Sequence, residues 1–444
     1  MADIAQTAAQ PPAETAAEAG PRPAARESRF RTVVATGVGN ALEWFDWNAY
    51  AIFAPFLAAQ FFSKTDGLSA ILATLAVFAV GFAARPLGGF LFGWIADRRG
   101  RRFAMTLSVG GAAAGSLLIG VAPTYGTVGA AASLVLVAAR LVQGLAHGGE
   151  LPSAQTYVAE TAPAERRGLW SSLIYVSGTL GVMAATAFAA VLTSLLAPEQ
   201  MNAWGWRVPF LLGGLFGLYA LVMRRRMPET EVFENAASSA ARTDRPRMWP
   251  AIVAHRKQAL QIVGVTAGLT VVYYAWAVYA PQYAISNRGL DPAGALWAGL
   301  AANVVFLVAL PAWGALSDRI GRKPVLFISS LGMTAAIYPL NAFIGPHAWQ
   351  LAVAMAVAMV FVAASASIAP AVYAEIFPTH IRTVGVAVPY ALCVATFGGT
   401  APYLQTWMGA EFGEAYFTGY VAVLLLISSA VVASVPETRG RALR

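Results

Sequence analysis

The sequence carries little charge and almost no cysteine. Only 12% of its 444 residues are charged, against 58% hydrophobic residues and a mean hydropathy of +0.59. The single cysteine, Cys393, excludes an intramolecular disulfide and a cysteine-based metal cluster. A water-soluble surface needs more charge than this. The composition therefore predicts an all-α membrane protein and excludes a soluble enzyme or a nucleic-acid binder.

Sequence motifs of catalysis are also missing. The sequence has no G-x-x-x-x-G-K-S/T phosphate loop, no H-E-x-x-H, no G-x-S-x-G and no metal-spaced pair of histidines or cysteines. We therefore expect no catalytic residues, no metal site and no cofactor. ATP-driven pumping by this chain alone is not expected either.

Apolar runs bounded by charges, glycines or prolines divide the chain into twelve predicted transmembrane helices. The tail before them, residues 1–30, is rich in Ala, Pro and Glu and lacks the apolar core of a signal peptide, so we expect it to be disordered and cytoplasmic. The predicted helices span residues 32–62, 69–96, 103–122, 128–158, 169–195, 207–223, 259–285, 292–316, 324–344, 348–375, 383–408 and 414–435.

The basic residues fix the predicted orientation. Most of the 30 lysines and arginines lie in alternate loops, above all at 98–102, in the central loop 225–257 and in the tail 437–444. Because positive loops stay on the cytoplasmic side, both termini are predicted to be cytoplasmic. The expected location is a bacterial-type plasma membrane, the inner membrane of the cell, crossed many times.

Two patterns recur in the second half of the chain. Gly93, Asp97 and Arg101 return as Gly314, Asp318 and Arg322, within the segments GWIADRRGRR and GALSDRIGRK. Glu160, Pro163 and Arg167 likewise return as Glu375, Pro378 and Arg382. Such a repeat predicts two six-helix bundles, residues 31–224 and 258–436, of the kind that rock around a central site in secondary transporters.

Several ionisable side chains fall well inside the predicted spans, where an unpaired charge is costly and usually functional. Counted along the helices at about 1.5 Å per residue, Asp46, Arg85 and Arg140 lie near the membrane midplane. Glu43, Asp46 and Tyr50 share one helical face. The simpler alternative is that the acids only neutralise the arginines and hold the helices together.

The same motifs resemble a known family. The repeated G-x-x-x-D-R-x-G-R loops and the segment RLVQG at 140–144 resemble signatures of the major facilitator superfamily. GNALEWFD at 39–46, RPLGG at 85–89, GGE at 148–150 and WGWRVP at 204–209 are similar to its metabolite:proton symporters, most of all to 2-oxoglutarate permeases. His147 departs from this resemblance, since relatives usually have a smaller residue there.

The predicted site follows from these observations. Arg85 and Arg140 would bind a substrate carboxylate, which suits the guanidinium group, with Tyr50, Tyr273, Tyr279 and Tyr390 as further substrate contacts. Glu43 or Asp46 would take the transported proton, because substrate at the arginines weakens their hold on the acid. His147 would either relay protons or serve structure.

The family resemblance also implies an inner gate. It places Asp97 at the start of the eleventh span, near Arg382, and Asp318 at the start of the fifth, near Arg167. A carboxylate is stabilised there by the free N–H groups of the helix end. The predicted gating residues are Asp97, Arg101, Glu160, Arg167, Asp318, Arg322, Glu375 and Arg382.

The sequence thus predicts a proton-coupled symporter that imports a small carboxylate, with 2-oxoglutarate or a related dicarboxylate as the best candidate. The alternatives are a shikimate-like or monocarboxylate substrate, a proline- or betaine-like zwitterion, and a membrane sensor that transports nothing. The expected partners are the substrate, protons and the lipid bilayer, without nucleic acid, and we expect the chain to act as a monomer.

Overall fold

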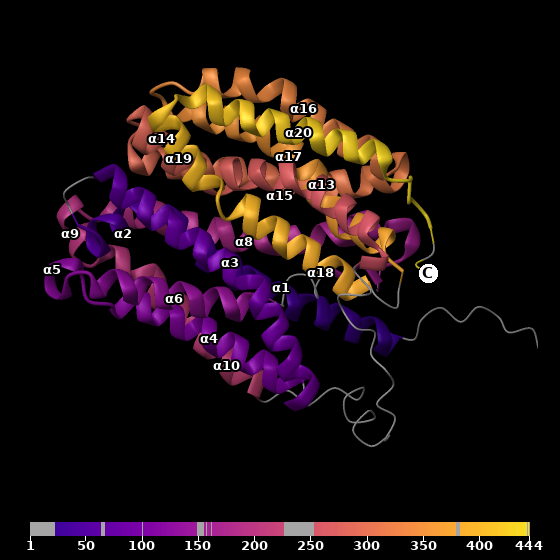
Figure 1. Ribbon diagram of the computed structural model, residues 1–444, viewed down its shortest axis with the longest axis horizontal. Coiled ribbons are helices and arrows are strands. Elements are labelled where there is room, and N and C mark those ends of the chain that lie inside the picture. The colour runs from indigo at the N-terminus through magenta and orange to yellow at the C-terminus, as the bar shows by residue number, and fades with distance from the viewer. Residues whose placement is uncertain are drawn as a thin grey trace, which may run out of the picture.

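Long apolar helices run side by side along the molecule, as the computed structural model in Figure 1 shows. The structure describes residues 23–63, 67–99, 101–148, 155–156, 158–160, 162–225, 253–378, 382–441 and 443. In this part of the chain, ten helical segments are long and apolar enough to cross a membrane, and a further apolar helix, Ala131–His147, is shorter. The chain is therefore built as a multi-pass membrane protein.

The helices of the first half are α1 (Pro23–Ile52), α2 (Ala54–Phe61), α3 (Gly67–Arg99), α4 (Arg101–Val121), α5 (Tyr125–Val128), α6 (Ala131–His147), η1 (Ala164–Arg166), α8 (Arg167–Leu195), α9 (Pro198–Ala203), η2 (Gly205–Arg207) and α10 (Val208–Arg225). Those of the second half are α13 (Arg256–Tyr273), η3 (Tyr274–Tyr279), α14 (Ala280–Arg288), α15 (Pro292–Ile320), α16 (Arg322–Phe343), α17 (Ala348–Ile376), α18 (Arg382–Cys393), η5 (Val394–Gly398), α19 (Ala401–Glu411) and α20 (Glu414–Ser434).

Each predicted span overlaps a helix, but three of them are not uniform α-helices. The first breaks at Phe53 into α1 and α2, because Pro55 has no N–H to continue the ladder. The first helix also begins at Pro23, ahead of the predicted start near Arg31. The seventh and eleventh spans contain the π-helical segments η3 and η5 in their middles. Such wide turns are frequent at functional sites.

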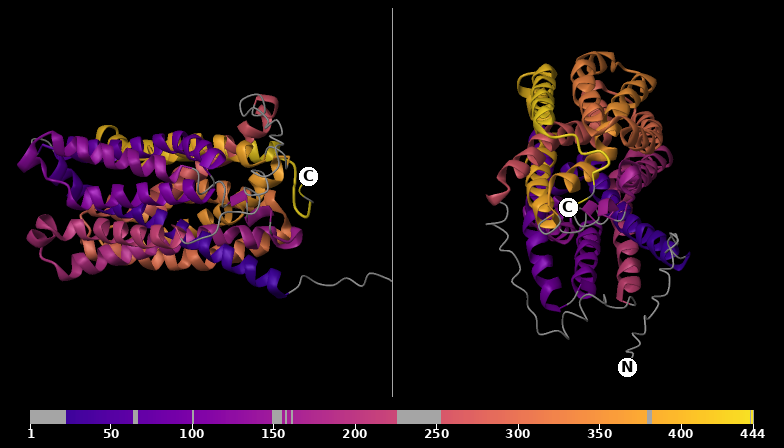
Figure 2. Two further views of the ribbon diagram at one scale, coloured as in Figure 1. Left: turned by 90° about the horizontal axis from the view of Figure 1, so that it is seen from below. Right: turned by 90° about the vertical axis from the view of Figure 1, so that its right-hand side faces the viewer.

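The helices of each half of the chain pack mainly on one another. In the first half α1 packs on α8, α3 on α6, and α4 on α6 and α10; in the second half α17 packs on α15 and α16, and α20 on α13 and α16. The halves meet where α8 contacts α15 and α17, where α3 contacts η5, α18 and α19, and where α1 contacts η3. The end-on view in Figure 2 (right) shows most helices of the second half on one side and most of those of the first half on the other.

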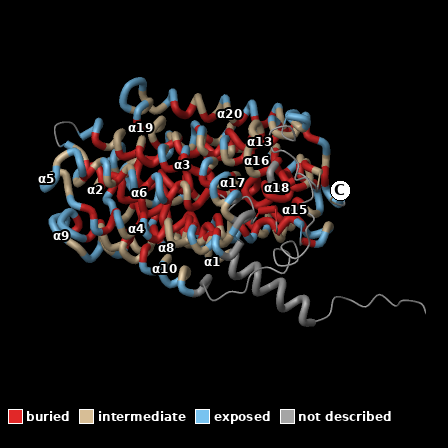
Figure 3. The backbone as a smooth tube through the Cα atoms, turned by 60° about the horizontal axis from the view of Figure 1, so that its bottom comes forward, coloured by how far each residue is buried: buried red, intermediate tan, exposed pale blue. Residues whose placement is uncertain are grey.

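Buried residues fill the interior along the whole length of the helices, whereas exposed residues follow the outer surface and the loops (Figure 3). Large apolar side chains are nevertheless exposed on that outer surface: Leu87, Phe90 and Leu134 are each more than 60% exposed. Contiguous exposed apolar surface on long apolar helices is suited to lipid contact rather than to water.

Glycines set the distance between α3 and α6. A Cβ atom at Gly144 would lie 2.0 Å from the carbonyl oxygen of Gly81, and one at Gly148 would lie 1.9 Å from the carbonyl oxygen of Arg85. The two backbones are thus in direct contact, as small residues allow in membranes. This contact holds Arg85 against α6.

Replacing Gly144 with valine should prevent this contact. Because the obstructing atoms belong to backbone, the helices must separate, and we expect a loss of about 3 kcal/mol or more of folding free energy. Thermal unfolding of the purified protein in detergent measures it. Gly409→Val is the matched control, since nothing lies within 4 Å of a Cβ atom there. Equal melting temperatures for the two variants would contradict this account of the α3–α6 contact.

Candidate functional site

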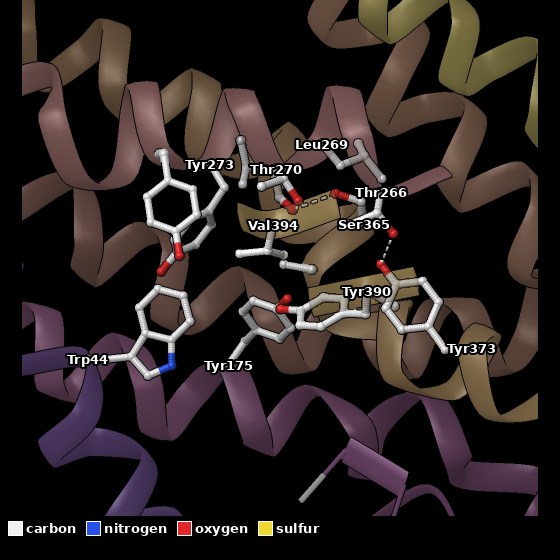
Figure 4. Close-up of a pocket in the computed structure, with 14 residues that line it drawn as sticks. Trp44, Tyr175, Thr266, Leu269, Thr270, Tyr273, Ser365, Tyr373, Tyr390 and Val394 are labelled. Carbon is white, nitrogen blue, oxygen red and sulfur yellow. Dashed lines mark hydrogen bonds between the residues drawn. The ribbon is translucent and has the colours of Figure 1, made fainter. Parts of the chain in front are cut away.

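An aromatic cavity lies between the two halves of the chain (Figure 4). Its volume is about 30 Å³, which is room for a few water molecules at most. Of the fourteen described residues that line it, six are aromatic and none is charged. The lining residues are Trp44, Tyr175, Thr266, Leu269, Thr270, Tyr273, Tyr274, Val362, Ser365, Ala366, Ala369, Tyr373, Tyr390 and Val394.

The rings around the cavity come from six elements, α1, α8, α13, η3, α17 and α18, and contact one another. Trp44 of α1 meets Tyr273 of α13 edge to face, with 5.2 Å between ring centroids, and it stacks on Tyr274 at 6.4 Å. Tyr175 of α8 lies 6.1 Å from Tyr273. On the other side, Tyr373 of α17 lies 5.7 Å from Tyr390. Residues of both halves therefore form one wall around this space.

A charged pair lies next to this aromatic wall. Arg85 of α3 donates to Glu43 of α1, and both are buried. The Arg85 guanidinium carbon lies 5.2 Å from the Phe82 ring centroid, and that ring lies 5.3 Å from Tyr274, which lines the cavity. The pair is thus one aromatic ring away from the cavity. His147 Nδ1 lies 3.9 Å from the other carboxylate oxygen of Glu43.

A second buried cluster surrounds Asp46. Its Oδ2 atom accepts from Ser116 Oγ at 2.5 Å and from Gln143 Nε2 at 3.1 Å. Arg140 donates through Nη1 to Gln143 Oε1 at 2.8 Å, and its guanidinium carbon lies 4.0 Å from the Trp47 ring and 4.2 Å from the Tyr50 ring. Arg140 therefore packs on the rings of Trp47 and Tyr50 and is not among the residues that line the cavity.

The structure brings together only part of the predicted site. Tyr273 and Tyr390 line the cavity, whereas Tyr50 donates to the Thr74 carbonyl and Tyr279 hydrogen-bonds to Thr406. Residues that the sequence analysis did not propose include Trp44 and Tyr175, which line the cavity, and Ser116 and Gln143, which contact Asp46. Gln143 could have been predicted from its spacing, because it follows Arg140 by three residues and such residues share a helical face. Nothing in the sequence pattern pointed to Tyr175 or Ser116.

At the end of the bundle where α16 begins and α20 ends, the repeated charges pair across the two halves. We call this end the carboxy face. Arg167 donates to Glu375 at 2.8 Å, and Arg382 donates to Glu160 at 2.8 Å. Each arginine thus binds the glutamate of the other half. Each also donates through Nε to the carbonyl eight residues before it, Ala159 or Ala374.

Asp318 and Arg322 join this network from the second repeat. Asp318 accepts from the backbone N–H groups of Gly168 and Leu169 at 2.8 and 2.9 Å, so it caps the start of α8, where the family resemblance placed it. Arg322 donates to Asp318 at 2.7 Å and to Glu375 at 3.2 Å. The first-repeat counterparts Asp97 and Arg101 have side chains outside the described residues.

The end of the chain closes over the same network. Thr438 donates to Glu375 at 2.5 Å, and Arg167 donates to the Arg441 carbonyl at 3.1 Å. Glu437 accepts from the backbone N–H groups of Arg322 and Lys323, both at 3.0 Å. Burial raises the pKa of Glu437, but the backbone N–H groups outweigh this effect and bring the pKa below its ordinary value. Glu437 therefore stays ionised at neutral pH.

The opposite end of the bundle is held by different contacts. Ala54 and Leu75 of the first half pack with Tyr279 and Tyr283 of the second, flanked by Ile71 and Tyr403. One ion pair there, Arg288 with Glu414, is about one-third exposed. We call this end the apolar face. Both ends of the central cavity are thus covered in this structure, one by buried charges and one by apolar side chains.

The described residues contain no group of three or more His, Cys, Asp or Glu that could hold a metal ion. The charges of the site instead form pairs and hydrogen-bonded chains between helices. Such an arrangement can exchange one anion for another at an arginine and can take up a proton at a carboxylate.

Comparisons with known proteins agree with this architecture. A family model described as Major Facilitator Superfamily matches residues 36–309, and one described as Sugar (and other) transporter matches residues 234–444. The chain is 33% identical to the alpha-ketoglutarate permease of Escherichia coli, over 94% of this chain and 95% of the relative. It is also 33% identical to a putative proline/betaine transporter of Staphylococcus aureus, over 89% of this chain and 86% of the relative.

A citrate-proton symporter of Klebsiella pneumoniae is 29% identical, over 90% of this chain and 91% of the relative. Among solved structures, the xylose transporter of E. coli in a partially occluded inward-open conformation superposes with a TM-score of 0.71 at 19% identity. That superposition covers 93% of this chain and 99% of the other. At this identity it shows a shared fold.

Proposed function

Because this chain belongs to the major facilitator superfamily, we propose that it is a proton-coupled symporter that imports a small carboxylate metabolite by alternating access. The relatives named above are described as transporters, and we propose no catalytic function for this chain. The relatives named above carry different substrates. We take 2-oxoglutarate, or a related dicarboxylate, as the first substrate to test, because the permease for this compound matches nearly the whole chain.

The proposal includes the topology. We propose twelve spans, in which α1 with α2 forms the first and α6 the fourth, and two six-helix bundles at 31–224 and 258–436. The basic loops and the repeat support both features. The carboxy face would then be cytoplasmic, the apolar face would be external, and the membrane would be the inner membrane of a bacterial cell. The chain would work as a monomer.

The ion pair between Arg85 and Glu43, beside the aromatic cavity, is the observation that carries the proposed mechanism. A buried arginine whose partner is a side-chain carboxylate can exchange that partner for the carboxylate of a substrate. Glu43 would then be left in a low-dielectric site without its cation, and protonation would neutralise it. Binding of the substrate and of the proton are coupled in this way, because each favours the other.

His147 and Arg140 complete the mechanism. His147, 3.9 Å from Glu43, would pass protons to or from that carboxylate. Arg140 would add positive potential from its position against the Trp47 and Tyr50 rings. The cavity of about 30 Å³ is too small for a dicarboxylate. The bundles must therefore move apart at one face before the substrate binds, which is what alternating access requires.

One observation favours a second candidate substrate. Trp44, Tyr175 and Tyr273 surround the cavity with ring faces and edges, and none of the described residues that line it is charged. Such a wall is suited to an onium group through cation–π contacts. A zwitterion with one carboxylate would place that group among the rings and its carboxylate on Arg85. A proline- or betaine-like compound is therefore the alternative to a dicarboxylate.

Uptake into proteoliposomes tests the proposal. Radiolabelled 2-oxoglutarate should accumulate under an inward proton gradient, and a protonophore should abolish the accumulation. Citrate, shikimate, lactate, proline and betaine serve as unlabelled competitors and as labelled substrates in turn. Inhibition by betaine without inhibition by citrate would move the assignment to the zwitterion. Accumulation that survives the protonophore would remove proton coupling from the proposal.

A further inference from the structure

The side-chain amide of Gln143 lies between a buried cation and a buried anion. Its Oε1 atom accepts from Arg140 at 2.8 Å, while its Nε2 atom donates to Asp46 at 3.1 Å and to Ser116 Oγ at 2.8 Å. Arg140 and Asp46 form no direct ion pair within 4 Å among the described residues. The amide is therefore the connection between the two charges.

This cluster is closed off from water. Arg140, Gln143 and Ser116 are at most 1% exposed, and Asp46 is 7% exposed. Within the described part of the chain, Asp46 Oδ1 and the Nε and Nη2 atoms of Arg140 have no hydrogen-bond partner. Asp46 and Arg140 thus each depend on a few contacts. A change in the charge of one therefore alters the energy of the other.

We propose that Gln143 is a positioning residue that passes the protonation state of Asp46 to Arg140. This proposal rests on the proton coupling proposed above. It adds to that mechanism the link between Asp46 and Arg140. Asp46 and Glu43 then have different roles. Glu43 and the substrate carboxylate alternate as partners of Arg85, whereas Asp46 determines the hydrogen bonding of Arg140.

The physical basis is the polarity of the amide. While Asp46 is ionised, it holds the NH₂ group of Gln143, so that Oε1 faces the guanidinium of Arg140. Protonation of Asp46 removes the anion that orients the amide and leaves Arg140 as the least compensated charge of the cluster. Arg140 is then free to turn toward another anion. Because its guanidinium packs on the rings of Trp47 and Tyr50, that movement must change its contact with both rings.

Other ionisable groups surround Asp46 and have to be separated from it. Its own helix α1 contributes Glu43 and Tyr50, α3 contributes Arg85, and α6 contributes Arg140 and His147. From α10 the nearest position is Gly213, where a Cβ atom would lie 2.7 Å from Asp46 Oδ1, and α4 contributes Ser116. His147 is the group that needs a control, because its ring lies 6.3 Å from that of Trp47.

Two spectroscopic titrations of the full-length protein in lipid vesicles test the proposal without any substrate. The infrared band of the protonated carboxyl, assigned by its loss in Asp46→Asn, follows Asp46 from about pH 5 to about pH 9. The fluorescence difference between the protein and its Trp47→Phe variant follows Trp47, whose ring stacks on Arg140. All samples carry His147→Gln, so that the imidazole does not contribute to the response.

We expect both signals to change with the same midpoint in the parent protein. In Gln143→Leu the Asp46 band should still titrate, but the Trp47 response should be lost. Gln143→Glu should also lose the Trp47 response, because its carboxylate would hold Arg140 in either protonation state of Asp46. This variant keeps a partner for Arg140 and so serves as the test if the leucine variant does not fold. Ser116→Ala should keep the Trp47 response.

A Trp47 response that persists in the folded Gln143 variants overturns the proposal, and so does a parent protein in which the two midpoints differ. An Asp46 band that does not titrate in this range overturns it as well. The proposed function fails separately: if no compound accumulates under a proton gradient while the Trp47 response behaves as expected, the relay stands and the transport assignment does not.

Discussion

Replacement of Arg85 with glutamine is expected to lower gradient-driven uptake by about 100-fold or more. In the native protein Arg85 holds the buried carboxylate of Glu43 beside the cavity, and we propose that it binds the substrate carboxylate in turn. Removing one partner of a buried pair costs about 3–5 kcal/mol, because the other charge stays behind. Each 1.4 kcal/mol corresponds to about a factor of 10 in rate or affinity. Initial uptake rates in proteoliposomes measure the effect.

The double variant Glu43→Gln/Arg85→Gln separates transport from folding. Since it leaves no uncompensated charge, its melting temperature should return toward that of the parent protein. Uptake should stay low, because neither the anion site nor the proton site is restored. If the double variant recovered uptake along with stability, the ion pair would be structural, and the proposed exchange of partners at Arg85 would be wrong.

The second large effect is expected at the carboxy face, where Glu375→Gln should open the cavity to the cytoplasmic side. The Glu375 side chain is fully buried and accepts from Arg167, Arg322 and Thr438. An amide there would leave two buried arginines short of one negative charge, at a cost of about 3–5 kcal/mol to the closed arrangement. We expect the population with an open carboxy face to rise at least about tenfold.

Cysteine labelling measures this population. Cys393→Ser removes the native thiol, and Thr270→Cys places a new one in the wall of the cavity. An impermeant maleimide, applied to vesicles with the cytoplasmic side outward, should react faster in the Glu375→Gln background. Glu414→Gln is the matched control, because that glutamate pairs with Arg288 at the other end of the bundle. Equal labelling in both backgrounds would show that Glu375 does not keep this face closed.

Much of the fold was predictable from the sequence. The bilayer requires apolar spans of a set length and basic loops on the cytoplasmic side. Both requirements leave a pattern along the chain that can be recognised in the sequence. The family resemblance that these motifs carried is confirmed by the matched family model and by the permease relative. The position of Asp318 at the start of α8 was implied by the same resemblance.

The details of the candidate site were harder to predict from the sequence. A repeat predicts that Glu160 and Glu375 are equivalent, but only the packing of the halves shows that each binds the arginine of the other. Tyr175 reaches the cavity because α8 lies against α15 and α17, a tertiary contact without a local signal. Tyr279 is a predicted substrate contact that lies in the π-helical segment η3, and in this structure its hydroxyl hydrogen-bonds to Thr406.

The two π-helical segments have a mechanical consequence. η3 and η5 lie in the middle of their spans, and they contact α1 and α3 of the first half. A π turn holds one residue more than an α turn. If a π turn were converted to an α turn, the helix that follows would rotate by about 100° and shift by about 1.5 Å, the values for one residue. Each segment can therefore act as a swivel, which lets α14 and α19 rotate while α13 and α18 keep their places at the carboxy face.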